Sequence, residues 1–193
     1  MYTLDQIKKA VTSKGYAWFD DGEFNLNLVG VRNSTSGNKV TNLFDDHLTA
    51  AYKQKGIWRF HCWEATTDPG KKGMLLGKAK GGVARMVPGQ YRGAYALGLH
   101  QGKYQALRQV KKVKVYRDGN RDLNFDETRV DEGLFGINIH KAGENSVWVE
   151  NWSEGCQVFK RKKDFDLMMS LVKKSIPFWK NSFTYTLLES KDI

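Results

Sequence analysis

Cysteine is scarce in this chain of 193 residues, which contains only Cys62 and Cys156. Two cysteines cannot form the disulfide framework that staples small secreted domains. A chain of this length buries enough apolar surface to fold without such a framework. The sequence leaves open whether the two thiols pair. We therefore expect one domain over residues 1–193, stabilised by a hydrophobic core.

Long apolar runs are also lacking. No stretch approaches the roughly 18 consecutive apolar residues of a membrane-spanning helix. The first residues, "MYTLDQIKKAVTSKG", carry charge throughout and lack the apolar centre of a signal peptide. The sequence contains no linker, low-complexity tract or internal repeat. It predicts a chain without a membrane span that is made in the cytoplasm and, if it acts outside, is released by other means.

Positive charge is abundant, since 31 Lys and Arg residues face 21 Asp and Glu residues and give a net charge of +10. A basic surface attracts nucleic acids, anionic membranes and anionic wall polymers. The lysines occur in short runs spread along the chain, and none builds the concentrated basic helix typical of nucleic-acid recognition. Nucleic-acid binding therefore rests on charge alone and is the least favoured function.

Alternation of apolar and polar residues predicts many short strands. In "LFGINIH", for example, Phe135, Ile137 and Ile139 face one way, and Gly136, Asn138 and His140 face the other. There is no alternating βαβ rhythm, which excludes a doubly wound sheet. The predicted class is α+β, mostly β. We expect strands within residues 23–31, 56–65, 110–116, 134–140, 147–150, 156–159 and 182–188, and two more within 81–100.

Helical spacing is confined to a few segments. Residues 3–14 predict a helix within an N-terminal appendage over residues 1–20. Residues 43–54 are interpreted as a short helix. Residues 164–176 give the clearest helical pattern, which predicts a C-terminal helix packed on the sheet and ended by Pro177.

The segment "WSEGCQVF" places Cys156 after the turn-like run Ser153, Glu154 and Gly155. A nucleophilic cysteine needs a nearby imidazole and backbone N–H groups that hold the oxyanion of an attacked carbonyl. Gly155 would leave the backbone bare enough for a substrate to approach. His140 ends the "LFGINIH" strand on the face opposite its apolar residues, so it would face a cleft. Alternatively, Cys156 is a small buried residue, as free cysteines commonly are.

The pattern "GINIH", twelve residues, then "SEGCQV" resembles the signature of the L,D-transpeptidase (YkuD-like) family, in a divergent form. The resemblance implies a curved, YkuD-like β-sandwich or barrel with a few flanking helices. It implies Cys156 as the nucleophile, His140 as the base and a covalent thioacyl-enzyme, with no cofactor. The implied substrates are peptidoglycan stem peptides, processed by an L,D-transpeptidase, carboxypeptidase or endopeptidase beside a meso-diamino acid and a D-amino acid.

The sequence departs from that signature at three places, one of which is a gap between His140 and Ser153 that is slightly short for the family. Glu154 replaces a second histidine, and Gln157 with Val158 replaces an apolar residue followed by Asn or Arg. If the chain is an active enzyme, we expect Ser153, Glu154 and Gly155 to form the oxyanion loop, and Glu154 to orient His140 or the loop. The small basic chain would then be a phage-type wall enzyme that acts at the cell wall after release or within a particle. Alternatively, the departures mark an inactive structural or wall-binding module of a phage particle.

Three further residues are weaker candidates for substrate binding. His100, in "GLHQG", ends a predicted strand after a glycine and could line the same cleft. Arg92 offers a guanidinium for a carboxylate, whereas Arg85 and Arg117 are equally interpretable as surface charges. Trp152 could stack on sugar rings in a saccharide-binding cleft.

The segment "DGNRDLNFDETR", residues 118–129, offers a weak alternative metal site. Oxygen ligands at alternating positions resemble a calcium loop. Leu123 stands where such loops have glycine, and Arg129 where they have a bidentate glutamate. A solvated turn is therefore preferred over a calcium site. The candidate ligands are Asp118, Asn120, Asp122, Asn124 and Asp126.

Overall fold

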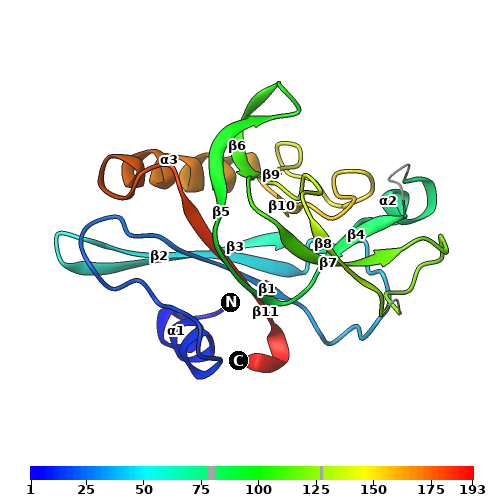
Figure 1. The fold of residues 1–193 in the computed structure, drawn as a ribbon, viewed down its shortest axis with the longest axis horizontal. Helices are drawn as coiled ribbons and strands as arrows, with labels where there is room; N and C mark the ends of the chain where they lie inside the picture. Colours follow the sequence, from blue (N-terminus) through cyan, green and yellow to red (C-terminus); the bar gives the residue numbers. More distant parts are fainter. Residues whose placement is uncertain (78–80, 127) are drawn as a thin grey trace.

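The computed structural model describes residues 1–77, 81–126 and 128–193. Within these residues, eight strands close a mixed barrel, and three further strands form a small sheet beside it (Figure 1). The predicted mostly-β class is therefore confirmed. In barrel order the strands are β1 (Asn27–Arg32), β11 (Phe183–Glu189), β5 (Gly89–His100), β6 (Tyr104–Gln109), β9 (Ile139–Lys141), β10 (Gln157–Phe159), β3 (Ile57–Thr66) and β2 (Asp46–Gln54). The small sheet contains β4 (Val83–Met86), β7 (Val113–Asp118) and β8 (Val130–Gly133).

Strand β2 overturns one prediction, because residues 43–54 do not form a helix. The strand lies between β1 and β3 and pairs antiparallel with both. Leu48, Ala50 and Tyr52 alternate into the main core, so the period is two rather than 3.6. Backbone pairing on both sides of the strand outweighs the weak helical pattern of the segment.

The structure also shortens or removes two predicted strands. Of residues 134–140, only the end belongs to β9, and residues 147–150 contribute a single bridge between Leu43 and Trp148. Strands β6 and β8 were not predicted. The remaining predicted strands are present with shifted ends.

Helix α1 (Leu4–Ser13) begins at Thr3, whose side chain accepts a hydrogen bond from the backbone of Gln6 in a capping box. Its buried face packs on the outside of β1 and β11. Lys14, just after the helix, forms an ion pair with Asp192 in the terminal turn η1 (Ser190–Asp192). Figure 1 shows the two chain ends close together. The helix packs through Ile7, Ala10 and Val11 against Val29, Val31 and Leu188.

Helix α3 (Lys162–Trp179) lies on the far side of the barrel from α1 (Figure 1). The prediction that Pro177 ends this helix is wrong, since the helix continues to Trp179. It ends at Lys180, where φ is +63° and the amide donates to the carbonyl of Ile176. One missing amide so near the helix end removes little hydrogen bonding. Its buried face consists of Phe165, Met168, Met169, Leu171, Val172 and Ser175. The short helix α2 (Lys71–Leu76) follows β3.

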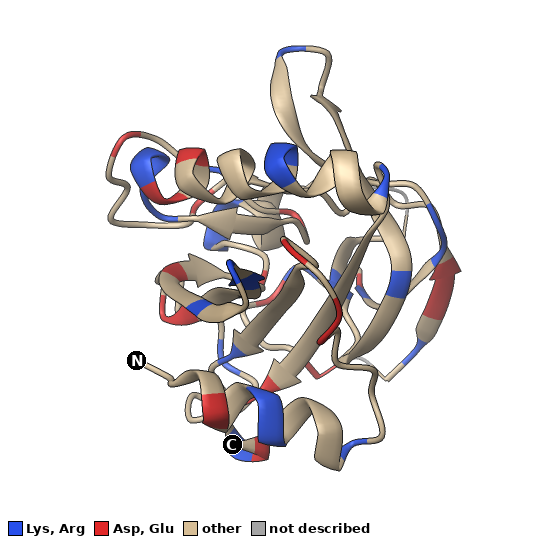
Figure 2. Cartoon of the chain, turned by 90° about the vertical axis from the view of Figure 1, so that its left-hand side faces the viewer, with Lys and Arg blue, Asp and Glu red and all other residues tan. Residues whose placement is uncertain are grey.

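Lys and Arg residues are interspersed with Asp and Glu over the ribbon, including on α1 and α3 (Figure 2). The net positive charge is therefore distributed rather than gathered on one element. Among the described residues, no helix combines the length and the apolarity needed to cross a membrane.

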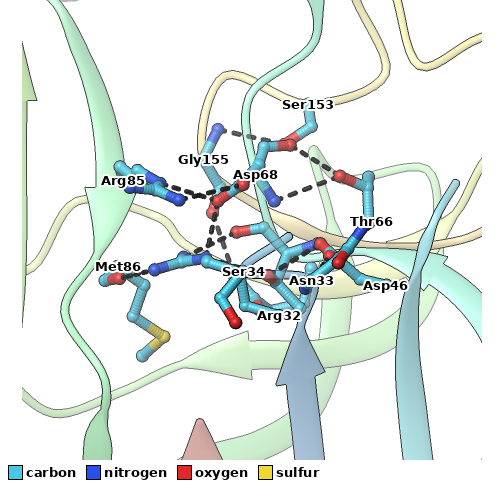
Figure 3. A network of polar contacts seen from close by, with 12 residues as sticks. Arg32, Asn33, Ser34, Asp46, Thr66, Asp68, Arg85, Met86, Ser153 and Gly155 are labelled. Carbon is cyan, nitrogen blue, oxygen red and sulfur yellow. Dashed lines mark hydrogen bonds and ion pairs between the residues drawn. The ribbon is translucent and has the colours of Figure 1, made fainter. Parts of the chain in front are cut away.

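Arg32, Asp46, Asp68 and Arg85 form a buried ionic cluster beside the barrel (Figure 3). The Arg32 side chain is 1% exposed, and its Nε lies 2.7 Å from Oδ1 of Asp68. Arg85 donates to both carboxylate oxygens of Asp68, at 2.9 and 3.2 Å. Arg32 also donates to the carbonyl of Met86 at 2.9 Å. The interpretation of Arg85 as a surface charge is therefore wrong.

Asp46 completes the ionic cluster through backbone donors. Its carboxylate accepts hydrogen bonds from the amides of Asn33 and Thr67, both at 2.6 Å, and from the Thr67 hydroxyl at 2.8 Å. The carbonyl of Thr67 in turn accepts from Nη2 of Arg32 at 3.1 Å. The cluster thus ties the end of β1 to the segment after β3 and to β4.

Candidate active site

Strands β9 and β10 bring the predicted nucleophile and base together. They pair in parallel, with His140 opposite Val158 and Ile139 opposite Gln157. Cys156 directly precedes β10, so it lies beside Asn138, two residues before His140. Cys156 and His140 line one pocket of about 620 Å³. His100, Trp152, Glu154 and Gly155 line the same pocket.

The Cys156 thiol rests against the loop before β9. Its Sγ accepts from the amide of Asn138 at 3.4 Å and donates to the carbonyl of Gly136 at 3.5 Å. Among the described residues it makes no hydrogen bond with His140, so attack requires the thiol to rotate towards the imidazole. Burial raises the pKa of Cys156 to about 11. The resting group at neutral pH is therefore a thiol.

His140 is buried and fixed in one tautomer. Its Nδ1 lies 2.9 Å from the carbonyl of Lys141, which can only accept, so Nδ1 carries the proton. The hydroxyl of Tyr104 lies 3.3 Å from the same nitrogen. Burial, and then the neighbouring His100, lower the pKa of His140 to about 4. Neutral His140 therefore has a free electron pair on Nε2, as a general base requires.

His100, at the end of β5, stacks on His140 with ring centroids 4.1 Å apart. The side-chain amide of Asn138 lies 3.0 Å from Nδ1 of His100. The oxygen of that amide accepts from the backbone N–H of Gln109 at 3.0 Å. His100 is therefore a buried part of the pocket and not a surface histidine at a strand end.

Gln109 explains why residues 134–138 are not a regular strand. Its side-chain oxygen accepts hydrogen bonds from the amides of Phe135 and Ile137, at 3.1 and 3.0 Å. Its side-chain nitrogen donates to the carbonyl of Gly133 at 2.8 Å. A single carboxamide thus replaces the strand pairing of this segment, while Ile137 still packs into the core.

Ser153 braces the turn before Cys156. Its buried hydroxyl accepts from the amide of Gly155 at 3.1 Å and donates to the carbonyl of Cys156 at 2.8 Å. Gly155 has φ of +135°, and a Cβ there would lie 2.0 Å from the carbonyl oxygen of Ala84. Glycine is therefore needed for close packing on β4, and its amide is already used by Ser153. This differs from the predicted role of Gly155 as an open oxyanion donor.

The two residues that replace those of the family signature, Glu154 and Gln157, lie in different environments. Glu154 is exposed at the pocket and, among the described residues, makes no hydrogen bond with His140. Gln157 is fully buried, accepts from the hydroxyl of Tyr185 at 2.8 Å, and donates to the carbonyl of Gly155 at 3.1 Å. Gln157 therefore supports the loop from beneath.

Of the remaining substrate-binding candidates, one lines the pocket and the other does not. Trp152 is 43% exposed and lines the pocket. Arg92 lies outside it, with its guanidinium 5.2 Å from the ring centre of Phe19. Arg117 lines the pocket instead and donates to the carbonyl of Gly82 at 3.0 Å. The guanidinium that lines the pocket therefore comes from β7.

The proposed calcium segment contains local turns. The amide of Asp122 donates to the side chain of Asn120, and the amide of Asn124 donates to the side chain of Asp122, at 3.0 and 2.7 Å. These are Asx turns, the preferred reading. Among the described residues, no three His, Cys, Asp or Glu side chains gather as a metal site requires. Glu127 lies outside the described residues.

Both cysteines are free thiols. Sequence reasoning did not select Asn138 or Gln109 as site residues. The alternation in "GINIH" did place Asn138 on the face of His140, which was the available signal. Comparisons with protein-family models, curated proteins and solved structures found no match.

Proposed function

We propose that this chain is a cysteine-dependent enzyme that processes peptidoglycan stem peptides through a thioacyl-enzyme. The observation that carries the proposal is the presence of a thiol and a neutral imidazole in one pocket. The Lys141 carbonyl holds the proton of His140 on Nδ1, which leaves Nε2 as the proton acceptor. A base fixed by a third group is the arrangement that activates nucleophiles in acyl transfer.

In the proposed reaction, Sγ of Cys156 attacks a substrate carbonyl carbon while its proton passes to Nε2 of His140. The C–S bond forms as the carbonyl electron pair moves to oxygen. The amide of Cys156, which makes no hydrogen bond with the described residues, is a donor for that oxyanion. The C–N bond then breaks, and the leaving amine takes the proton from His140. Water or a second amine releases the acyl group.

The substrate class follows from the resemblance of residues 136–140 and 153–158 to the L,D-transpeptidase signature. The pocket contains an exposed carboxylate, Glu154, which suits a substrate that carries an amino group, whereas the Arg117 guanidinium is already paired with Asp131. The net charge of +10 suits anionic wall polymers as the surface that the enzyme meets. We place its action at the cell wall, after release or as part of a phage particle.

A second candidate is an inactive wall-binding module. Two observations favour it: Glu154 stands where the signature has histidine, and the resting thiol contacts Gly136 rather than His140. The two candidates differ in whether Cys156 reacts with an acyl donor in the folded protein.

Intact-protein mass spectrometry after incubation with a carbapenem tests the proposal. We expect one adduct on the wild type and on Cys62→Ala, and none on Cys156→Ala. Digestion of purified sacculi, with product analysis, would then identify the bond. An unreacted Cys156 in the folded protein, with labelling only after denaturation, would overturn the enzyme and leave the binding module.

A further inference from the structure

The proposed site offers few backbone N–H groups that could donate a hydrogen bond to the oxyanion. The amide of Gly155 is bound to the Ser153 hydroxyl at 3.1 Å, and that of Asn138 contacts the thiol, whereas the amide of Cys156 makes no hydrogen bond with the described residues. Enzymes that form tetrahedral oxyanions commonly use at least two preorganised donors. Another N–H within this pocket should therefore serve the oxyanion.

Hydrogen bonding fixes the tautomer of His100. The Gln109 amide can only donate, so the Asn138 side-chain atom that receives it is the oxygen. The Asn138 nitrogen therefore donates to Nδ1 of His100 at 3.0 Å. Because Nδ1 accepts, neutral His100 carries its proton on Nε2. That Nε2 makes no hydrogen bond with the part of the chain that the structure describes.

The two stacked histidines therefore carry their protons on different ring nitrogens. His140 carries its proton on Nδ1 and presents an acceptor at Nε2, whereas His100 presents a donor at Nε2. Asn138 connects His100 to the nucleophile, since its side chain binds His100 and its backbone amide contacts the Cys156 thiol. Both rings and the thiol line the same pocket. One ring is thus prepared to take a proton and its neighbour to donate a hydrogen bond.

We infer that His100 is a catalytic residue whose Nε2–H donates to the oxyanion formed when Cys156 attacks a carbonyl. The inference rests on the proposed function and adds a residue to it. His100 comes from β5, far in sequence from the turn that carries Glu154. It would supply a pocket imidazole in a chain whose cysteine loop lacks the second histidine of the signature.

The test compares two reactions of Cys156 in full-length protein. Acylation by a carbapenem forms an oxyanion, whereas alkylation by iodoacetamide forms none. We expect His100→Ala to slow acylation by about 10²- to 10³-fold and to change alkylation by less than about threefold. His100→Gln, which offers an amide N–H at similar reach, should recover acylation to within about tenfold of the wild type. His61→Ala is the matched control, because His61 is also stacked between aromatic rings but lies outside the pocket.

The outcomes distinguish a failure of the His100 assignment from a failure of the proposed function. Equal losses of acylation and alkylation in His100→Ala would show that His100 only supports the fold or His140, and would overturn the assignment. Unchanged acylation in His100→Ala would overturn it as well, with the proposed function intact. A wild type that is alkylated but never acylated would overturn the proposed function, and the assignment with it.

Discussion

Two polar clusters, both largely buried, adjoin strand β4, and they are built on different principles. Ala84 contacts the cysteine turn through Gly155, while the next residue, Arg85, enters the ionic cluster. In the ionic cluster each charge meets an opposite charge or backbone groups at 2.6 to 3.2 Å. In the cysteine and histidine pocket the thiol and the two stacked imidazoles are neutral, and the thiol has only contacts of 3.4 and 3.5 Å.

The difference follows from the cost of burial. A buried charge needs a full set of partners, because removing one leaves an uncompensated ion. A neutral imidazole or thiol can be buried with one atom unpaired at much smaller cost. The ionic cluster is therefore suited to fixing β1, the segment after β3, and β4 in one arrangement. The pocket keeps atoms that are free to react.

Cys156→Ala should have the largest functional effect and little structural effect. We expect all acylation and wall processing to be lost, because the nucleophile is gone. The free energy of unfolding should change by less than about 1 kcal/mol, because the thiol has only long, weak contacts. Urea denaturation and the carbapenem assay on the same sample measure both quantities. A large fall in stability would indicate a core cysteine and remove the contrast.

Asp68→Ala should have the opposite effects, a large loss of stability and little change in the reactivity of Cys156. It leaves Arg32 buried without its carboxylate, which should cost about 3–5 kcal/mol of unfolding free energy. Urea denaturation measures the loss, and alkylation of Cys156 in the fraction that stays folded should be unchanged. Asp166→Ala is the control, since Asp166 pairs with Lys162 on the exposed face of α3, where water screens the pair and its loss should change stability far less. Equal losses in the two variants would contradict the role given to the ionic cluster.

The pocket was more predictable from sequence than the ionic cluster. Alternation in "GINIH" indicates which way His140 faces, and the turn before Cys156 is visible in its residues. By contrast, Arg32, Asp68 and Arg85 come from three separate segments, and their pairing depends on the closed barrel. From sequence alone, an arginine in a strand is interpreted as a surface charge, because its partners come from other segments.

Other differences have similarly specific causes. Strand β2 has a weak helical pattern, and only its two neighbouring strands make it extended. The irregular residues 134–138 are held by the side chain of Gln109, a long-range contact with no spacing rule. The role expected of the Gly155 amide changed because Ser153, two residues earlier, uses that amide.

The pH dependence of the two Cys156 reactions should sharpen the comparison. Burial lowers the pKa of His140 to about 4 and raises that of Cys156 to about 11, so the pair is neutral between these values. We expect the acylation rate to be level from about pH 5 to 10 and to fall below about pH 4, as His140 takes up a proton. Alkylation follows the thiolate and should rise about tenfold per pH unit towards pH 11.

The contrasting outcome would be that Cys156 and His140 rest as a thiolate and an imidazolium, an ion pair like those of the ionic cluster. A thiolate stabilised by imidazolium would give alkylation that is already level near neutral pH and a bell-shaped acylation profile. Rates measured by mass spectrometry of quenched reactions, from about one pH unit below the pKa of His140 up to the pKa of Cys156, would decide between the two. The control is Cys62, whose thiol lies in β3 outside the pocket and should not be acylated at any pH.

Tyr104→Phe should have the smallest effect. The Tyr104 hydroxyl lies 3.3 Å from Nδ1 of His140, but the Lys141 carbonyl is closer, at 2.9 Å, and fixes the tautomer alone. The ring of Tyr104 also packs on Phe165, a contact that the phenylalanine keeps. We therefore expect acylation to fall by no more than about threefold, with an unchanged pH profile. A loss above about tenfold, or a shift of the acidic limb, would mean that the hydroxyl positions the base. The pocket would then depend on a complete set of partners, as the ionic cluster does.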